Sequence, residues 1–87
     1  MNTLKKALAI YGEANQLDAV VEECAELIVA IRHYRRNRCD ILTVIEEGVD
    51  VQLMLEQLQL ISQHSTDWKR IRKFKLRRLQ AKLSGGA

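Results

Sequence analysis

The fold is decided by two stretches, LDAVVEECAELIVAIRHY at residues 17–34 and ILTVIEEGVDVQLMLEQLQLI at residues 41–61. In the first, apolar side chains recur at spacings of three and four residues: Leu17, Val20, Val21, Cys24, Ile28 and Ile31. This period predicts an amphipathic helix with one buried stripe. The second stretch is apolar around much of its circumference, which is typical of a helix buried by several neighbours.

The flanking sequence predicts two more helices, one on either side of this pair. The four expected helices span residues 3–11, 16–34, 41–61 and 68–83, and the stripe of the last is Trp68, Ile71, the stem of Lys75, Leu76 and Leu79. Residues that favour helix ends stand at the breaks, with glycine ending a helix and short polar side chains starting one. These end signals are Gly12, Asn15, Asp40 and Ser65 or Thr66.

Length and composition favour one small all-α domain over residues 1–87, with residues 84–87 frayed. Eighty-seven residues suffice for a single core, and the absence of proline together with only four glycines argues against a turn-rich β-sandwich or barrel. A chain this short buries a modest core by itself. We therefore expect a four-helix bundle-like domain that is completed by oligomerisation, as a homodimer or homotetramer.

Charge is divided sharply along the chain. Residues 1–60 hold six Lys/Arg and ten Asp/Glu, a net charge of −4, whereas residues 61–87 hold eight Lys/Arg and Asp67 alone, a net charge of +7. Such a division suits an anionic ligand that also needs a metal cation, and equally a nucleic-acid-binding helix. Cys24 and Cys39 have neither disulfide-framework nor zinc-ligand spacing. With no export signal or membrane-length apolar run in the sequence, we expect a cytoplasmic protein without membrane partners.

Two acidic clusters of matching spacing are the distinctive feature. Glu22, Glu23 and Glu26 form E-E-x-x-E on the second expected helix, and Glu46, Glu47 and Asp50 form E-E-x-x-D on the third. Residues three or four apart lie on one helix face, where like charges repel. A single such cluster is most simply a solvated surface. Two on neighbouring antiparallel helices, with few interleaved cations, instead predict carboxylates that converge on a metal.

The chemistry of these ligands selects the metal. Carboxylate oxygens without imidazole or thiolate favour Mg²⁺, with Mn²⁺ as an alternative, and the Glu-x-x-His pattern of di-iron bundles is absent. Mg²⁺ sites in proteins are commonly completed by substrate phosphates. The sequence therefore predicts a phosphorylated substrate and a metal-activated water.

The chain resembles the MazG-like branch of the all-α nucleoside triphosphate pyrophosphohydrolases over about residues 8–83. The resemblance is carried by YGEANQLDAVVEECAELIVAIRHYRR, by ILTVIEEGVDVQLMLEQLQLI and by FKLRRLQAKL. The hallmark of that superfamily is E-x-x-E followed by E-x-x-D, which correspond here to Glu23 with Glu26 and Glu47 with Asp50. The flanking residues Tyr11-Gly12, Asn15-Gln16 and Lys75-x-x-Arg78-Leu79 look like those of small phage-type and bacterial members.

The resemblance implies hydrolysis of a nucleoside or deoxynucleoside triphosphate to the monophosphate and pyrophosphate. Glu23, Glu26, Glu47 and Asp50 would hold Mg²⁺, and Glu22 or Glu46 would position or deprotonate the attacking water. Substrate contacts would come from Lys75, Arg78 and Gln16, although Gln16 could equally be only a helix-start residue. A neighbouring subunit could supply part of the nucleotide pocket.

The alternative hypothesis is a non-catalytic interaction protein that binds nucleic acid through its basic C-terminal helix. Only Trp68 and Phe74 accompany the cations of that helix, and both are explained as core residues. A nucleic-acid-binding bundle has no use for paired carboxylate clusters. We therefore expect nucleic acid not to be the partner.

Overall fold

The computed structural model describes residues 2–85, and all regular structure in that range is helical. The helices are α1 (Asn2–Tyr11), α2 (Glu13–Arg35), α3 (Ile41–Ser62) and α4 (Ser65–Leu83). This confirms the predicted all-α class and the number of helices. No helix in the described range is long and apolar enough to cross a membrane.

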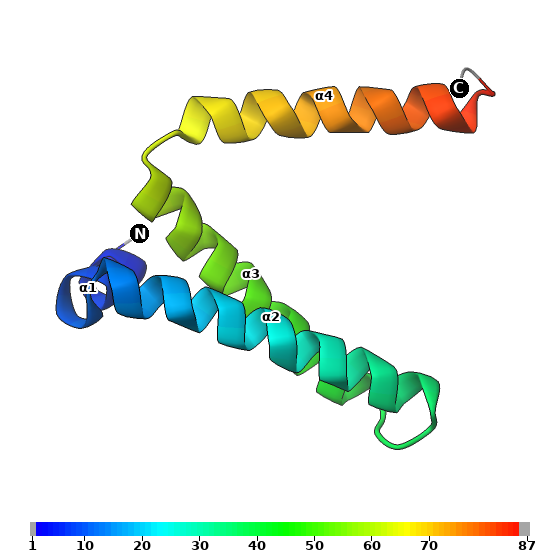
Figure 1. Cartoon of the computed structure of the whole chain (residues 1–87), viewed down its shortest axis with the longest axis horizontal. Helices are drawn as coiled ribbons and strands as arrows, with labels where there is room; N and C mark the ends of the chain where they lie inside the picture. Colours follow the sequence, from blue (N-terminus) through cyan, green and yellow to red (C-terminus); the bar gives the residue numbers. More distant parts are fainter. Residues whose placement is uncertain (1, 86–87) are drawn as a thin grey trace.

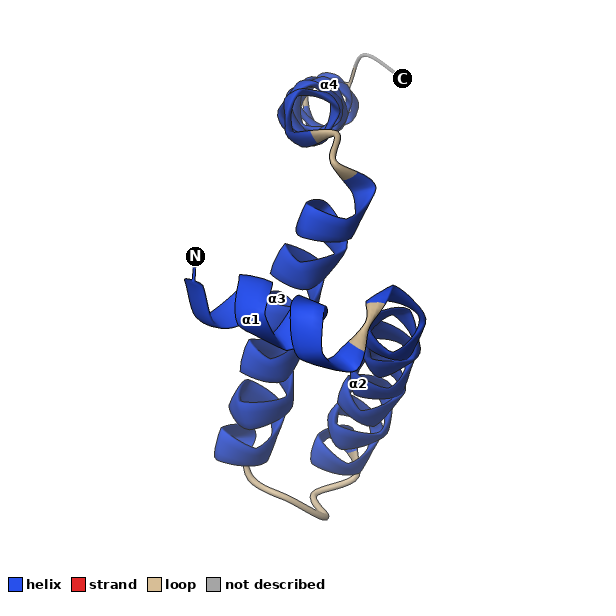
Figure 2. Cartoon of the chain, turned by 90° about the vertical axis from the view of Figure 1, so that its left-hand side faces the viewer, coloured by secondary structure: helices blue, strands red, loops and turns tan. Residues whose placement is uncertain are grey.

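The centre of the molecule is an antiparallel hairpin of α2 and α3, with α1 lying across the open end of the pair (Figures 1 and 2). A short connection, in which Asn37 has a φ of 59°, reverses the chain between the two helices. Helix α4 touches α3 alone and projects away from the hairpin (Figure 1). The chain is therefore open and flat, with extents of 48 × 40 × 19 Å.

The junction of α1 and α2 is tighter than the sequence predicts. Gly12 has a φ of 86°, a backbone that favours glycine, and its carbonyl accepts from the Gln16 backbone N–H at 3.0 Å. Because this one residue makes the turn, α2 begins at Glu13. The prediction of Asn15 as helix cap is wrong: Asn15 lies inside α2, where its Nδ2 donates to the Tyr11 carbonyl at 2.8 Å.

Asp40 caps α3 as predicted, and its Oδ1 accepts from the backbone N–H groups of Leu42 and Thr43 at 2.9 and 3.3 Å. The predicted start of α4 is wrong by one turn. His64 occupies the cap position, and its carbonyl accepts from the Trp68 N–H at 3.0 Å, so Ser65 is already helical. After α4, Ser84 and Gly85 form a turn, while the rest of the segment predicted to fray, residues 86–87, lies outside the described residues.

Very little of the single chain is buried. Among the described residues, the buried side chains are Ala30, Gln16 and Gln57. The predicted buried stripe of α2 is wrong for one chain, since Val21 is 68% exposed and Ile28 57% exposed. The reason is geometric: within the described residues, α3 covers one side of α2, and α1 is the other helix that contacts it.

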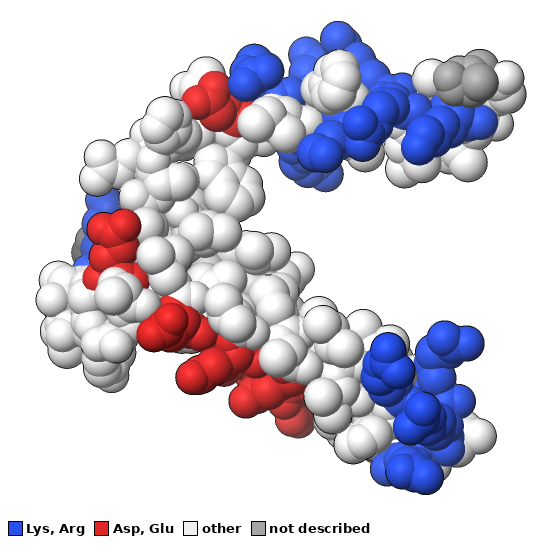
Figure 3. Space-filling model, viewed as in Figure 1, with Lys and Arg blue, Asp and Glu red and all other residues white. Residues whose placement is uncertain are grey.

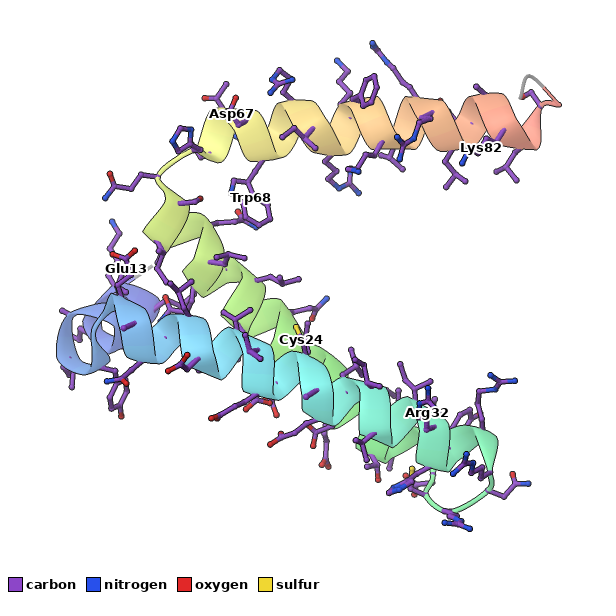
Figure 4. All side chains as sticks on the ribbon, viewed as in Figure 1. Glu13, Cys24, Arg32, Asp67, Trp68 and Lys82 are labelled. Atoms are coloured by element: carbon purple, nitrogen blue, oxygen red, sulfur yellow. The ribbon has the colours of Figure 1, made fainter. Side chains whose placement is uncertain are left out.

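Helix α4 has no buried residue along its 19-residue length. Its expected apolar stripe is instead the wall of a groove between the end of α3 and α4, lined by Trp68, Ile71, Leu76 and Leu79. The groove is held at its base by the Trp68 indole, which points from α4 toward α3 (Figure 4) and donates to the Ser62 hydroxyl at 2.9 Å. In proteins, most of the stability of a helix comes from packing of its apolar face, which α4 lacks along most of its length within one chain.

Replacing Asp40 with alanine is expected to destabilise the fold by about 1 kcal/mol, because two backbone N–H groups at the start of α3 lose their acceptor. Urea denaturation measures the change. Asp40→Asn keeps an acceptor oxygen at the same place and is expected to retain most of the stability. An equal loss in both variants would show that the charge of Asp40, not its capping bond, matters.

Candidate metal centre

The two acidic clusters lie opposite each other because of the register of α2 and α3. Gln57 Nε2 donates to Gln16 Oε1 at 2.8 Å, which fixes one layer of the antiparallel pair. Moving seven residues along both helices from that layer brings Glu23 opposite Asp50, and moving ten brings Glu26 opposite Glu47. Seven residues are about two helical turns, so Glu23 and Asp50 lie near the line of the glutamine pair along their helices, whereas ten residues are about 2.8 turns, so Glu26 and Glu47 are turned to one side of that line. Of the four, Glu23 and Glu47 are half-buried and Glu26 and Asp50 exposed.

Three carboxylates meet in this interface. Glu23, Glu26 and Glu47 each offer an oxygen, and these atoms lie within 4.8 Å of one another. Glu23 and Glu47 are half-buried, whereas Glu26 is exposed at the edge of the group. The arrangement offers one oxygen-lined position, open to solvent on the Glu26 side.

The remaining residues of the two acidic clusters are Asp50, Glu22 and Glu46, which lie outside this group of three. Asp50 is close enough for its charge to raise the pKa of both Glu23 and Glu47, although it is outside the group of three. Glu22 and Glu46 are exposed neighbours on the outer faces of their helices. Together the acidic side chains form one continuous face along the hairpin (Figure 3).

The electrostatics of the group oppose ionisation. Burial is the largest cause that raises the pKa of Glu23, followed by the charges of Glu26, Asp50 and Glu47. Burial likewise raises the pKa of Glu47, with Glu26 next and Asp50 and Glu46 after it. One buried oxygen on each of Glu23 and Glu47 has no hydrogen-bond partner among the described residues. The group therefore holds negative charge and lone pairs that the rest of this chain does not satisfy.

No lysine or arginine neutralises the group within residues 3–85. The ion pairs there are those of Asp67 with His64 and Arg70, at the start of α4. The arginines of the hairpin tip lie at the opposite end of α2 from Gln16, beyond the acidic face (Figure 3). Such a carboxylate group, without cationic side chains, has the hard oxygen donors that Mg²⁺ prefers.

The three expected substrate-contact residues are not gathered at the group. Lys75 and Arg78 lie on α4, which is separated from the acidic face (Figure 3). Lys75 lines the α3–α4 groove, and the Arg78 guanidinium is 6.0 Å from the centre of the Phe74 ring. Gln16 is buried two turns from Glu23 and is engaged with Gln57.

Gln57 is the residue at this interface that sequence reasoning missed. It is the most buried side chain described, with no exposed surface, in a chain whose apolar residues are mostly exposed. One feature of the sequence could have revealed it. Gln57 follows Asp50 by seven residues, about two helical turns, and so lies on the carboxylate face of α3, unlike the exposed glutamines of that helix.

Comparison of the chain with models of known protein families, with curated proteins and with solved structures gave no match.

The raised pKa values of Glu23 and Glu47 predict a pH dependence of metal-free stability. Their protons are bound more tightly in the folded than in the unfolded chain, so the folded state is favoured below the ordinary glutamate pKa of about 4.3. This contribution is lost as pH rises through the raised values. With EDTA present, the Tm of Glu47→Gln relative to the unsubstituted protein should therefore increase as pH rises from about 4 to 7.

The matched control is Glu56→Gln, an exposed glutamate on the same helix outside the group. Asp67 has a pKa lowered by His64 first and Arg70 second, and its opposite pH dependence is the same in all three proteins. It therefore cancels from the differences. If Glu47→Gln and Glu56→Gln show the same Tm difference at every pH, the carboxylates do not interact in solution.

Proposed function

We propose that the chain is a Mg²⁺-dependent nucleotide pyrophosphohydrolase of the MazG-like type, cleaving a nucleoside or deoxynucleoside triphosphate to the monophosphate and pyrophosphate. The observation that carries the proposal is the convergence of Glu23, Glu26 and Glu47 oxygens within 4.8 Å, without a cationic side chain paired to them in the described range. The E-x-x-E and E-x-x-D motifs supply the same residues from the sequence side. The identification as MazG-like rests on those motifs.

The metal ligands would be Glu23, Glu26 and Glu47, with Asp50 as the adjoining fourth carboxylate. A bound Mg²⁺ supplies Lewis-acid polarisation of a phosphate oxygen and acidifies a coordinated water. A cation bound there would give the buried carboxylate oxygens of Glu23 and Glu47 a partner, and would offset both the burial and the like charges that raise their pKa values. The donor set therefore fits the cation.

The reaction is a displacement at the α-phosphorus. The water oxygen forms a bond to the phosphorus, the bond from that phosphorus to the α–β bridging oxygen breaks, and pyrophosphate leaves with the electron pair. Glu22 or Glu46, exposed beside the group, would accept the proton that the water loses. Catalysis of this kind consists mainly of positioning and electrostatic stabilisation.

Lys75 and Arg78 would neutralise substrate phosphate charge. Because α4 stands apart from the acidic face of its own chain, these cations would reach a carboxylate group by assembly of two or more copies (Figure 3). The exposed apolar residues of α2, α3 and α4 support a homodimer or homotetramer, since one chain leaves them uncovered.

Assembly predicts that sedimentation velocity at micromolar concentration gives at least a dimer. The apolar faces of α2 and α3 would then be covered, and the Tm would rise with protein concentration. A stably folded monomer with a concentration-independent Tm would contradict this prediction.

The proposed activity predicts that the protein releases pyrophosphate from a nucleoside triphosphate in the presence of Mg²⁺. The Glu47→Gln variant should lose this release. Mg²⁺ at about 100 times its Kd should stabilise the unsubstituted protein by roughly 2.7 kcal/mol. The substitution removes one of the clustered charges at constant size. It should therefore weaken the Mg²⁺ response while leaving the metal-free protein at least as stable near neutral pH.

Two outcomes would oppose the proposal. If Glu47→Gln melts far lower without metal yet keeps the full Mg²⁺ shift, Glu47 belongs to a structural network. If pyrophosphate release is absent for every nucleoside triphosphate in a screen while the protein binds DNA in a salt-dependent way, the basic α4 is a nucleic-acid-binding element instead. The same screen identifies the preferred base and sugar.

A further inference from the structure

The Gln16–Gln57 pair is anomalous for this chain. Gln16 is 7% exposed and Gln57 0% exposed, whereas long apolar side chains of the same two helices stand in solvent. The pair is joined by a single hydrogen bond of 2.8 Å, and Gln57 Oε1 is buried without a partner among the described residues. Burying an unsatisfied amide oxygen opposes folding. A buried amide pair that leaves one oxygen unpaired is less stabilising than apolar side chains would be at this place. Its position at the most buried point of the fold therefore indicates a role other than stability.

The acidic group indicates what that role is. Its like charges favour any arrangement that separates them, so something must hold them together. Aliphatic side chains recur along both α2 and α3. Apolar contact by itself therefore specifies the register of the two helices only weakly. If α3 slid along α2 by about one turn of four residues, Glu47 would stand opposite Ala30 in place of Glu26. Gln57 would then stand opposite Val20, which has no side-chain group to bond its amide.

We propose that the Gln16–Gln57 amide pair sets the register of α2 against α3 and thereby holds Glu23, Glu26 and Glu47 together. The two glutamines are positioning residues: they lie two turns or more from the carboxylates and act through helix alignment. A buried polar pair at one layer of an otherwise apolar helix interface is a known means of specifying register at some cost in stability.

If the two glutamines set the register, replacing both should change stability and metal affinity in different ways. Replacing both amides with leucine removes the unsatisfied polar group, so the Tm should stay equal or rise. Removing the register signal should lower metal affinity by about 10- to 100-fold, as happens when groups that orient metal ligands are lost. A merely structural role predicts the reverse, a lower Tm and unchanged affinity of the folded protein.

The experiment compares the intact protein with Gln16→Leu/Gln57→Leu and with the control Gln52→Leu/Gln59→Leu, whose glutamines are exposed on α3. Each protein is titrated with Mn²⁺ alone by electron paramagnetic resonance, melted with EDTA, and examined by amide-correlation NMR. The NMR spectrum reports register without metal, because alternative alignments give extra or displaced peaks along α2 and α3. Should the leucine pair not fold, Gln16→Met/Gln57→Met keeps a shape closer to glutamine.

The expected result is at least tenfold weaker Mn²⁺ binding with displaced or multiple α2–α3 peaks in the leucine or methionine pair, at equal or higher Tm, and no change in the control. Native-like peaks with unaltered Mn²⁺ affinity would overturn the proposal and assign the register to the short connection between the helices. The metal part of the test rests on the proposed function. If the unsubstituted protein does not bind Mn²⁺, that function fails, and the register is then judged by the NMR spectra alone.

Discussion

The structure depends on how the repulsion among Glu23, Glu26 and Glu47 is contained. Three carboxylates with oxygens within 4.8 Å would separate if the helices were free to slide or part. Two features oppose this in the single chain, the buried Gln16–Gln57 bond at one end of the hairpin and the tight connection at the other, where Cys39 Sγ donates to the Ala30 carbonyl at 3.6 Å. The acidic group lies between these two anchors.

The core of the single chain is too small to offset this repulsion easily. With Ala30 as the buried apolar residue of the described chain, hydrophobic burial within one copy supplies little free energy to offset the charge repulsion. A divalent cation at the carboxylates and a second copy against the exposed apolar faces would each add stability through binding. Folding, the proposed metal binding and the proposed assembly would then be linked equilibria, and a change in one would alter the apparent strength of the others.

Sequence reasoning succeeded where the signal is local. The helix count, the end of the first helix at Gly12 and the cap at Asp40 follow from short-range stereochemistry, and the spacing of the glutamates placed Glu23 and Glu26 on one helix face. It failed at Asn15, because glycine alone closed the α1–α2 junction, and at Gln57, because glutamine in a helix is read as a surface residue until its partner across the interface is known. Burial of the α2 stripe within one chain was mispredicted for a related reason: periodicity identifies an apolar face but does not show whether another element covers it.

The proposed chemistry requires basic residues near the acidic group, but in one chain the position of α4 keeps them apart. The eight cations of residues 61–87 counterbalance the acidic body in the sequence total, yet in space the basic helix and the acidic face are apart (Figure 3). An anionic substrate is attracted by one and repelled by the other unless metal ions first neutralise the carboxylates. Metal binding would therefore precede productive substrate binding, and the basic helix of a neighbouring copy would then meet the phosphates from the open Glu26 side. The exposure of Glu26, beside two half-buried partners, marks the direction from which that approach is open.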